Sequence, residues 1–410
     1  MNCRHCGATL TLDLIDLGSA PPSNAYLSAE ALHAPERWYP LRVRVCERCW
    51  LVQTEDYAGA EDLFTPDYAY FSSYSRSWLA HAERYVTRAV RDLGLDGSSC
   101  VVEVAANDGY LLQYVQALGI PCYGIEPTAG TAAAARARGI GIVEEFFGRH
   151  LAIRLLEEGR PADLMVANNV LAHVPDIDDF VAGFAILLKA DGVATFEFPH
   201  LLSLVEKVAF DTLYHEHFSY LSLTAVSGIL AANGLSVFHV EELTTHGGSL
   251  RVYAQRRDTG RRAVTPAVGD FLAREGAAGV RTQAFYAGFQ ERAERVKDDL
   301  LAYLIETKRK GLAMAAYGAA AKGNTLLNFA GVRPDLLPYV ADRNPEKQGK
   351  YLPGSRIPIV AEDHLRSRRP DRILILPWNL REEVVTQLAY AREWGARFVT
   401  AIPRLHESER

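Results

Sequence analysis

Short apolar runs, separated by stretches with helical spacing, give the middle of the chain its pattern. The first run covers residues 100–105, and a polar turn at 107–109 leads into residues with helical spacing. A second run follows at 121–126. Strand, turn, helix and strand in this order are typical of the nucleoside-binding half of a doubly wound α/β sheet. Two later runs extend this sheet, at residues 162–169 and 192–199, with a helix between them at 177–188.

A second pattern of the same kind occupies the end of the chain. Residues 313–317 predict a strand that leads through the glycine-containing turn 318–323 into a helix. Asp342 stands at the end of the next apolar run, as an acid does after the second strand of a nucleotide-binding unit. Runs at 373–376 and 397–402 are expected to continue a parallel sheet.

Two features connect these patterns. Residues 236–240 and 250–255 look like paired strands. Apolar residues then recur at helical spacing, at Phe285, Phe289, Val296, Leu300 and Leu304. This spacing predicts one long amphipathic helix over residues 283–308, with its apolar stripe in the core.

Length and charge bound the class of protein. With 410 residues, 49% of them hydrophobic, the chain is expected to form an α/β protein with domains at residues 1–65, 66–235 and 236–410. A net charge of −6 disfavours nucleic acid and anionic membranes as partners. No apolar run is long enough to cross a bilayer and residues 1–6 lack a signal-peptide core, so we expect a cytoplasmic protein. No exposed self-pairing stripe suggests assembly, so we expect a monomer.

Four of the six cysteines form two Cys-x2-Cys pairs near the start of the chain. Cys3 and Cys6 make the first pair, and Cys46 and Cys49 make the second. Four thiolates in two such pairs are the ligand set of a closed, tetrahedral structural zinc site. We therefore expect zinc to stabilise this region without taking part in chemistry. The alternating residues 41–46 predict a strand that leads into the second pair.

The turn after the first central strand indicates which cofactor binds there. It lacks the Gly-x-Gly-x-x-Gly fingerprint that lets a backbone approach a pyrophosphate, which disfavours a dinucleotide. Glu126 ends the next strand, at the position of a carboxylate that binds ribose hydroxyls. S-adenosylmethionine, a nucleoside without phosphate, fits this pattern. The expected cofactor-binding residues are Glu103, Asn107, Gly109, Glu126 and Asn169.

The densest group of titratable side chains lies at residues 213–220, Leu-Tyr-His-Glu-His-Phe-Ser-Tyr. Histidine exchanges protons near neutral pH, a phenol can donate to a developing oxyanion, and a carboxylate can orient an imidazole. In a helix Tyr214 and His217 would share a face, whereas in a strand His215 and His217 would do so. His173 follows a strand that ends in Asn169, so it is also expected to face the ligand crevice.

Two stretches of the second half could bind an anionic substrate. His246, Gly247, Gly248, Ser249 and Arg251 fit either a phosphate or carbonyl cradle or a plain tight hairpin. Lys322 stands at a predicted helix N-terminus, where it could meet a nucleotide diphosphate. The turn 318–323 is not a P-loop, because the Gly-Lys-Ser/Thr element is missing.

These motifs occur in an order that resembles the sugar C-methyltransferases of deoxysugar pathways. Besides the two Cys-x2-Cys pairs, the matching stretches are residues 103–112, 168–176, 214–220, 246–251 and 317–324. The resemblance implies a zinc-binding N-terminal domain, a central class I methyltransferase domain and a C-terminal Rossmann-like domain that helps bind a sugar nucleotide. Its implied catalytic set is Tyr68, His173, Tyr214, Glu216 and His217, and Ala106 departs from the commonest family form, which has Ser there.

The resemblance implies methylation at C3 of a nucleotide-linked 4-keto-6-deoxy sugar, with dTDP as the expected nucleotide, in deoxysugar and antibiotic biosynthesis. A hydrogen beside a ketone can be removed because an enolate results. We expect His217 to act as base with Glu216 orienting it, Tyr214 or His173 to donate to the enolate oxygen, and Tyr68 to position a ligand. The alternatives are an O- or N-methyltransferase acting on a nucleotide sugar, and a non-catalytic protein that binds zinc and nucleotide.

Overall fold

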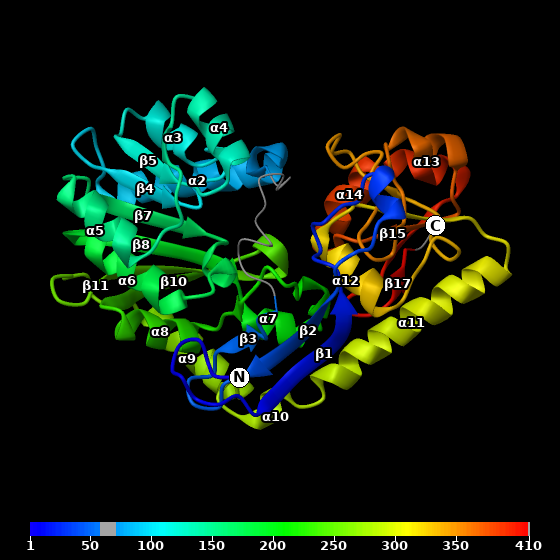
Figure 1. Cartoon of the computed structure of the whole chain (residues 1–410), viewed down its shortest axis with the longest axis horizontal. Coiled ribbons are helices and arrows are strands. Elements are labelled where there is room, and N and C mark those ends of the chain that lie inside the picture. Colours follow the sequence, from blue (N-terminus) through cyan, green and yellow to red (C-terminus); the bar gives the residue numbers. More distant parts are fainter. Residues whose placement is uncertain (58–70, 409–410) are drawn as a thin grey trace.

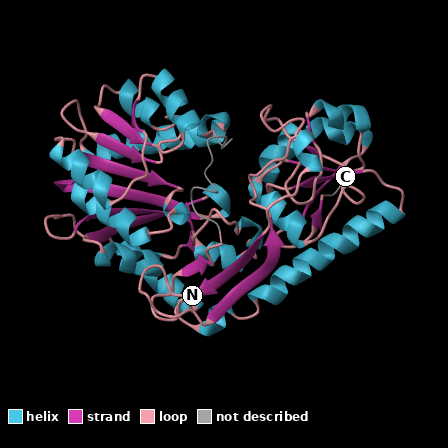
Figure 2. Cartoon of the chain, in the orientation of Figure 1, coloured by secondary structure: helices cyan, strands magenta, loops and turns pink. Residues whose placement is uncertain are grey.

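The computed structural model describes residues 1–57 and 71–408. These residues form a seven-stranded, a six-stranded and a four-stranded sheet. The two larger sheets build two lobes, and the smallest lies at the base between them (Figure 1). Helices flank the strands of both lobes (Figure 2). The expected α/β class is confirmed, and the two larger sheets have the strand order of Rossmann-like folds.

The four-stranded sheet is antiparallel and combines three strands from the start of the chain with one from its middle. Val43 and Val45 on its second strand are fully buried, while Arg42 and Arg44 point to the other face, as the alternating pattern predicts. The strands, in spatial order, are β1 (Leu12–Ala20), β2 (Tyr39–Val45), β3 (Val52–Thr54) and β9 (Ser219–Tyr220). Because β9 comes from the predicted catalytic stretch, the N-terminal sheet includes part of that stretch.

The seven-stranded sheet has the doubly wound order β10-β11-β8-β7-β4-β5-β6. All its strands run parallel except β11, which is antiparallel to both neighbours. The strands are β4 (Val101–Val104), β5 (Cys122–Ile125), β6 (Gly141–Val143), β7 (Ala162–Asn168), β8 (Leu188–Pro199), β10 (Leu235–Leu243) and β11 (Ser249–Arg256). The apolar runs predicted as strands of this sheet are thereby confirmed.

The first helix of this lobe precedes its strands in the chain, and the others lie between them. The first one, α2 (Arg76–Leu93), begins at Ser75, whose hydroxyl accepts from the Trp78 amide, and ends at the left-handed Gly94. The others are α3 (Leu112–Ala117), α4 (Ala129–Ala137), α5 (Arg149–Glu157), α6 (Ile177–Leu187), α7 (Leu201–Glu206) and α8 (Leu223–Ala232).

Strands β10 and β11 lie in the central sheet although they follow residue 235. The expected division at residues 235 and 236 therefore falls within this sheet and not between two domains. The reason is that β11 pairs with β8 over seven residue pairs, so the hairpin completes the sheet edge. His246, Ser249 and Arg251 consequently belong to the central lobe.

The six-stranded sheet has the order β14-β13-β12-β15-β16-β17, and only β17 is antiparallel. Its strands are β12 (Met314–Tyr317), β13 (Val340–Ala341), β14 (Ile359–Val360), β15 (Arg372–Ile375), β16 (Arg397–Thr400) and β17 (His406–Glu407). The associated helices are α12 (Ala321–Phe329), α13 (Asp363–Arg368) and α14 (Arg381–Gln387). Asp342, at the end of β13, accepts from the Ala319 amide at 2.7 Å and so fixes the turn after β12.

The long helix expected over residues 283–308 is interrupted. Helix α10 (Gln283–Tyr286) and helix α11 (Phe289–Arg309) are separated at Gly288, which has a φ of 71°. A residue in the left-handed region cannot continue an α-helix. Helix α9 (Pro266–Ala278) precedes them, and α11 runs diagonally from the base to the C-terminal lobe (Figure 1).

The hydrophobic cores cross the lobes. One core contains side chains of β1 and β2 together with α11 and the C-terminal sheet. Another contains Cys3 and Cys46 together with the central sheet. The N-terminal region therefore contributes side chains to the cores of both lobes.

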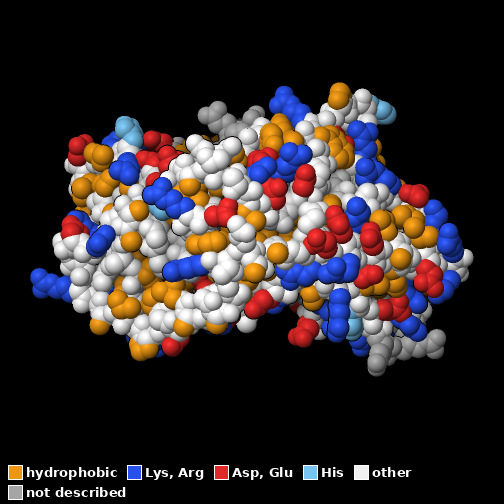
Figure 3. Space-filling view, turned by 90° about the horizontal axis from the view of Figure 1, so that it is seen from below, with side chains coloured by type: hydrophobic (Ala, Val, Ile, Leu, Met, Phe, Trp, Pro, Cys, Tyr) orange, Lys and Arg blue, Asp and Glu red, His pale blue; other side chains and the backbone are white. Residues whose placement is uncertain are grey.

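On the face seen in Figure 3, basic and acidic side chains are interspersed, without a large area of one sign. Among the described residues, no helix has the length and apolar character needed to cross a membrane.

Candidate active site

The two larger sheets turn the carboxyl ends of their parallel strands toward one cavity of about 700 Å³. Loops after β4, β5 and β7 line it from the central lobe, and loops after β12 and β15 line it from the C-terminal lobe. In each sheet these strands include the two at which the strand order reverses, the usual ligand crevice of a doubly wound sheet. The cavity therefore joins two crevices of the kind that bind nucleosides and nucleotides.

Glu126 has the environment expected of a ribose-binding acid. It lines the cavity after β5 and is only 5% exposed. Its carboxylate accepts from the amides of Asn107 and Thr128, both at 2.9 Å, which fixes both oxygens. A carboxylate has about four acceptor positions, so two hydroxyl groups of a ribose could still bind. This carboxylate acceptor fits the ribose of S-adenosylmethionine.

Glu103 and Gly109 were also expected to bind the cofactor, but neither lines the cavity. Glu103 is fully buried within β4, and burial raises the pKa of its carboxyl well above the usual value. Gly109 has a φ of 78°, and a Cβ there would lie 2.4 Å from Ile140 Cδ1. Gly109 therefore fits the tight turn that follows Asn107, and Glu103 belongs to the interior of the sheet.

Asn169 does line the cavity, directly after β7. It adopts the left-handed conformation with a φ of 54°, and its amide donates to the Glu197 carbonyl at 2.7 Å. Its side-chain oxygen is buried and has no hydrogen-bond partner within the described residues. A buried acceptor without a partner is costly, so this oxygen is suited to a ligand donor.

Three rings of the predicted catalytic set lie together in the cavity wall. The ring centroids of His173 and His217 are 4.5 Å apart, and those of Tyr214 and His217 are also 4.5 Å apart. Burial lowers the pKa of His173 to about 4, partly opposed by a hydrogen bond with the Glu216 backbone. Burial, together with the nearby His173, His246 and Lys322, lowers the pKa of His217 well below its usual value. Both imidazoles are therefore neutral at pH 7.

The stretch 213–220 is neither the helix nor the strand that the sequence left open, apart from β9 at its end. Tyr214 and His217 approach each other because residues 214–217 form a turn, closed by the His217 amide donating to the Tyr214 carbonyl at 3.0 Å. His215 points elsewhere, since its Nε2 lies 3.1 Å from the Tyr39 carbonyl and it does not line the cavity.

Glu216 has a partner that the sequence did not suggest. Both carboxylate oxygens accept from Asn24 Nδ2, at 3.0 and 3.1 Å, and the carboxylate is buried. Asn24 lies on the segment between β1 and β2 and lines the cavity. Its only sequence signal is its place after Pro21 and Pro22. Tyr68, the remaining member of the predicted catalytic set, lies outside the described residues.

Ser249 and Arg251, expected to bind substrate, do not line the cavity. The Ser249 hydroxyl donates to the Thr245 carbonyl at 2.9 Å, which closes the hairpin between β10 and β11. Arg251 is 2% exposed and forms ion pairs with Glu197 and Glu241. The contact of Ser249 therefore fits the tight hairpin and not the phosphate or carbonyl cradle.

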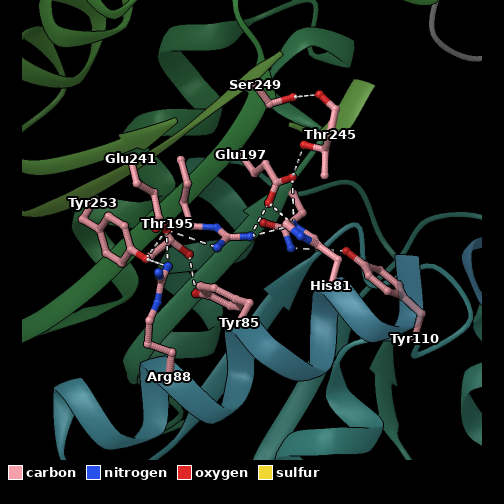
Figure 4. A network of polar contacts seen from close by, with 12 residues as sticks. His81, Tyr85, Arg88, Tyr110, Thr195, Glu197, Glu241, Thr245, Ser249 and Tyr253 are labelled. Carbon is pink, nitrogen blue, oxygen red and sulfur yellow. Dashed lines mark hydrogen bonds and ion pairs between the residues drawn. The ribbon is translucent and has the colours of Figure 1, made fainter. Parts of the chain in front are cut away.

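Glu197 is the centre of this buried network. It also binds His81 Nε2 at 2.9 Å and accepts from the Thr245 hydroxyl at 3.0 Å (Figure 4). Burial alone would raise the pKa of Glu197, but His81 and Arg251 lower it to about 2. The network thus joins α2 to the loop that carries His246.

His246 and Lys322, the other two residues expected to bind substrate, both line the cavity. Burial and the nearby Lys322 lower the pKa of His246 to about 4, so its ring is neutral. The Lys322 ammonium is almost fully buried and lies 5.3 Å from the centre of the Trp378 ring. Its one hydrogen bond in the described part of the chain is to Asn379 Oδ1, at 2.6 Å. A buried ammonium with so few partners is suited to an anionic ligand.

The four N-terminal cysteines converge as the two pairs predict. All four sulfur atoms lie within 4.8 Å of one another. Cys3 and Cys49 approach to 3.5 Å and Cys6 and Cys46 to 3.4 Å, so each contact joins one pair to the other. Four converging thiols fit a closed tetrahedral zinc site.

Comparisons with known proteins agree with this architecture. A zinc-binding domain family matches residues 3–64, a methyltransferase domain family matches 78–240, and the family described as C-methyltransferase C-terminal domain matches 244–403. The C-methyltransferase NovU of Streptomyces niveus is 33% identical over 401 residues, which cover 98% of this chain and 95% of that protein.

Solved structures match part of the chain. A magnesium protoporphyrin IX methyltransferase from Synechocystis with bound S-adenosylmethionine has 18% identity and a TM-score of 0.34, covering 43% of this chain and 79% of that one. An S-adenosylmethionine-dependent methyltransferase from Clostridium acetobutylicum has 11% identity and a TM-score of 0.36, covering 43% and 92%.

Proposed function

The chain belongs to the C-methyltransferase family, and we propose that it methylates C3 of a nucleotide-linked 4-keto-6-deoxy sugar through an enolate, in deoxysugar biosynthesis. That it is an S-adenosylmethionine-dependent C-methyltransferase with a zinc-binding domain follows from the matched families and the close relative. The sugar, the position and the mechanism are the proposal.

The observation that carries the proposal is the group of neutral, buried imidazoles between two nucleotide-type crevices. The central crevice ends at Glu126 and Asn169, and the C-terminal crevice ends at Lys322. His173 and His217 line the same cavity as both. A nucleotide sugar bound across the C-terminal crevice would thus present its sugar ring to these imidazoles and to the methyl donor.

We assign the proton transfer to His217. Its depressed pKa keeps the ring neutral, so it can accept the C3 hydrogen at physiological pH without first losing a proton. Carbon acids beside a ketone need a donor for the enolate oxygen as well as a base. The hydroxyl of Tyr214 or the ring of His173 would supply it, because both rings contact or closely approach His217.

Glu216 and Asn24 would act through position. The buried carboxylate of Glu216 is held by the Asn24 amide, which ties the residue beside His217 to the N-terminal segment. S-adenosylmethionine supplies an electrophilic methyl group when bound. The remaining task for the chain is alignment in a site that excludes water, and alignment alone can contribute several kcal/mol to the barrier reduction.

The substrate's charge would be met in the C-terminal lobe. Lys322, on the first turn of α12, is buried beside Trp378 and Asn379 with the Asp211 carboxylate nearby, and it lines the cavity, where its ammonium can attract an anionic group. A diphosphate supplies that charge, and the neighbouring helix N-terminus favours the same ligand. The expected nucleotide is dTDP.

Hydrogen exchange at C3 tests the mechanism. We expect the wild-type enzyme, with S-adenosylhomocysteine and the 4-keto sugar nucleotide in D₂O, to exchange the C3 hydrogen without methyl transfer. His217→Gln should keep affinity for both ligands but lose exchange and methylation by about a hundredfold or more.

His215→Gln is the matched control, because His215 lies two residues away and outside the cavity. Exchange and methylation at normal rates in His217→Gln would refute the assignment of the base. Methylation at oxygen or nitrogen without C3 exchange in the wild-type enzyme would refute the enolate and favour an O- or N-methyltransferase.

A further inference from the structure

Strand β3 lies between the zinc site and the predicted catalytic stretch. It consists of three residues that follow Cys49 closely, and it pairs with β2 on one side and β9 on the other. On the β9 side Val52 is opposite Tyr220 and Gln53 is opposite Ser219. Because β9 begins two residues after His217, a displacement of β3 would be transmitted to His217.

Gln53 connects β3 to the metal site. Its side chain is fully buried, and Nε2 lies 3.2 Å from the Cys3 sulfur, to which it donates. Its Oε1 accepts from the Arg4 amide at 2.9 Å. Hydrogen bonds to metal ligands orient those ligands and influence metal affinity. Gln53 therefore supports the first cysteine pair from the neighbouring strand.

Thr54 connects β3 to the catalytic stretch. Its hydroxyl donates to the His217 carbonyl at 2.9 Å, and its amide donates to the Phe218 carbonyl at 3.2 Å. The Phe218 amide in turn donates to the Ala172 carbonyl at 2.7 Å, one residue before His173. One threonine thus fixes the backbone on which His217 stands, and the next link reaches His173.

Arg4, between the two cysteines of the first pair, makes a parallel connection. Its guanidinium donates to the Thr54 carbonyl at 3.1 Å and to the Pro175 carbonyl at 2.9 Å. Its Cζ lies 5.3 Å from the centre of the Phe218 ring. The zinc loop therefore touches both segments that carry the imidazoles.

We propose that the zinc site, through Gln53, Arg4 and Thr54, is a positioning device that sets the places of His217 and His173. This inference rests on the proposed function, because it assumes that these imidazoles act on the substrate. A closed four-thiolate site can perform this role without binding substrate. The ladder between β3 and β9 has only two residue pairs, so a metal site tied to β3 would add rigidity to it.

The proposal predicts a separation of kcat from cofactor affinity. Glu126 and Asn169, the expected cofactor ligands at the ends of β5 and β7, receive no hydrogen bond from any of these three residues in the described part of the chain. A displaced His217 should thus lower kcat while the affinity for S-adenosylmethionine stays the same. A zinc site that only stabilised the fold would lower both together, or neither.

Thr54→Val tests the catalytic side, because it keeps the shape of the side chain and removes the donor to His217. We expect kcat to fall about tenfold, the affinity for S-adenosylmethionine to stay within twofold, and Thr54→Ser to restore most of the rate. Thr87→Val, on the exposed face of α2, is the control and should behave like the wild type. If Thr54→Val is not obtained folded, Arg4→Lys removes the guanidinium bonds and should show the same separation.

Gln53→Leu tests the metal side with a readout independent of activity. Transfer of zinc to a chromophoric chelator should be about tenfold to a hundredfold more favourable than for the wild type, and unchanged in Thr54→Val. Normal kcat in Thr54→Val and Arg4→Lys, or unchanged zinc transfer in Gln53→Leu, would overturn the proposal. Full activity of His217→Gln would instead overturn the proposed function, so the two failures are distinguishable.

Discussion

Arg251→Met should destabilise the protein and leave substrate binding intact. The sequence suggested Arg251 as a substrate ligand. In the structure this residue of β11 is buried between Glu197 on β8 and Glu241 on β10. Its Cζ also lies 4.1 Å from the centre of the Tyr85 ring. Methionine occupies a similar length without charge, so the substitution removes the ion pairs while filling most of the space.

The magnitude follows from the state of Glu197. His81 and Arg251 hold its pKa at about 2, against a usual 4.5, in spite of burial. At about 1.4 kcal/mol per pH unit this difference corresponds to about 3 kcal/mol of stability at pH 7. Breaking a buried pair by removing one partner generally costs about 3–5 kcal/mol. For a folding unit of 150 to 250 residues this predicts a melting temperature lower by roughly 10 °C.

The same reasoning fixes the pH dependence. The folded-state pKa of Glu197 is lowered, so its contribution is fully present above pH 4.5 and is lost as the pH falls toward 2. The melting temperature of Arg251→Met should therefore differ most from the wild type near neutral pH. Differential scanning calorimetry between pH 3 and pH 7 would measure this loss.

Arg274→Met is the matched control. Arg274 also pairs with a glutamate, Glu242, and lies over Phe271, but its side chain is 44% exposed. An exposed pair contributes about 0–1 kcal/mol, so its melting temperature should change by only a few degrees. A melting temperature for Arg251→Met equal to that of Arg274→Met, or a raised KM for the sugar nucleotide at temperatures where Arg251→Met is folded, would refute the reasoning.

Three further predictions concern the cavity. Glu126→Ala should weaken S-adenosylmethionine binding about tenfold or more by calorimetry, because charged hydrogen bonds contribute about 1.5–3 kcal/mol, and unchanged affinity would exclude it as the ribose ligand. Asn24→Ala should lower kcat about tenfold with cofactor affinity unchanged, since Glu216 loses the amide that holds it; a changed cofactor affinity would contradict this. Because burial lowers the pKa values of His173 and His217, the acidic limb of kcat/KM should lie below pH 6, whereas a limb at the usual imidazole value would contradict a buried neutral base.

The parts of the fold that the sequence predicts well are those with local periodicity. Each central strand is a short apolar run that ends in a polar turn, and the two cysteine pairs carry their own spacing rule. The positions of Glu126 and Asn169 in the crevice could also be predicted, because residues at the carboxyl ends of parallel strands meet at one crevice whatever the details of packing. These signals depend only on neighbours in the chain.

The conformation of residues 213–217 could not be predicted in that way. Both local alternatives, helix and strand, are wrong because the turn is held by partners distant in sequence. Thr54 binds the His217 carbonyl, and Tyr220, at the end of the same stretch, pairs with Val52. Nothing within the stretch itself indicates these contacts.

Arg251 shows why residue type alone misassigned part of the substrate site. On β11, residues 249, 251 and 253 share one face of the strand, and a sequence does not tell which face meets the ligand. The neighbouring strands decide it, since β8 contributes Glu197 and β10 contributes Glu241 to the face of Arg251. A buried arginine is stabilised by carboxylates. Arg251 has two of them on adjacent strands, so its charge is already paired within the protein.

Asn24 and Lys322 show why the cavity could not be predicted from the sequence. Asn24 reaches Glu216 from the N-terminal segment, and Lys322 enters from the C-terminal sheet. Both line a space that exists only because the four-stranded sheet packs against each lobe and turns the two crevices toward each other. A methyl donor and a nucleotide sugar bound at separate switch points would then meet at His217 by the geometry of the fold, so the activity should depend on the packing of the N-terminal sheet as much as on the imidazole itself.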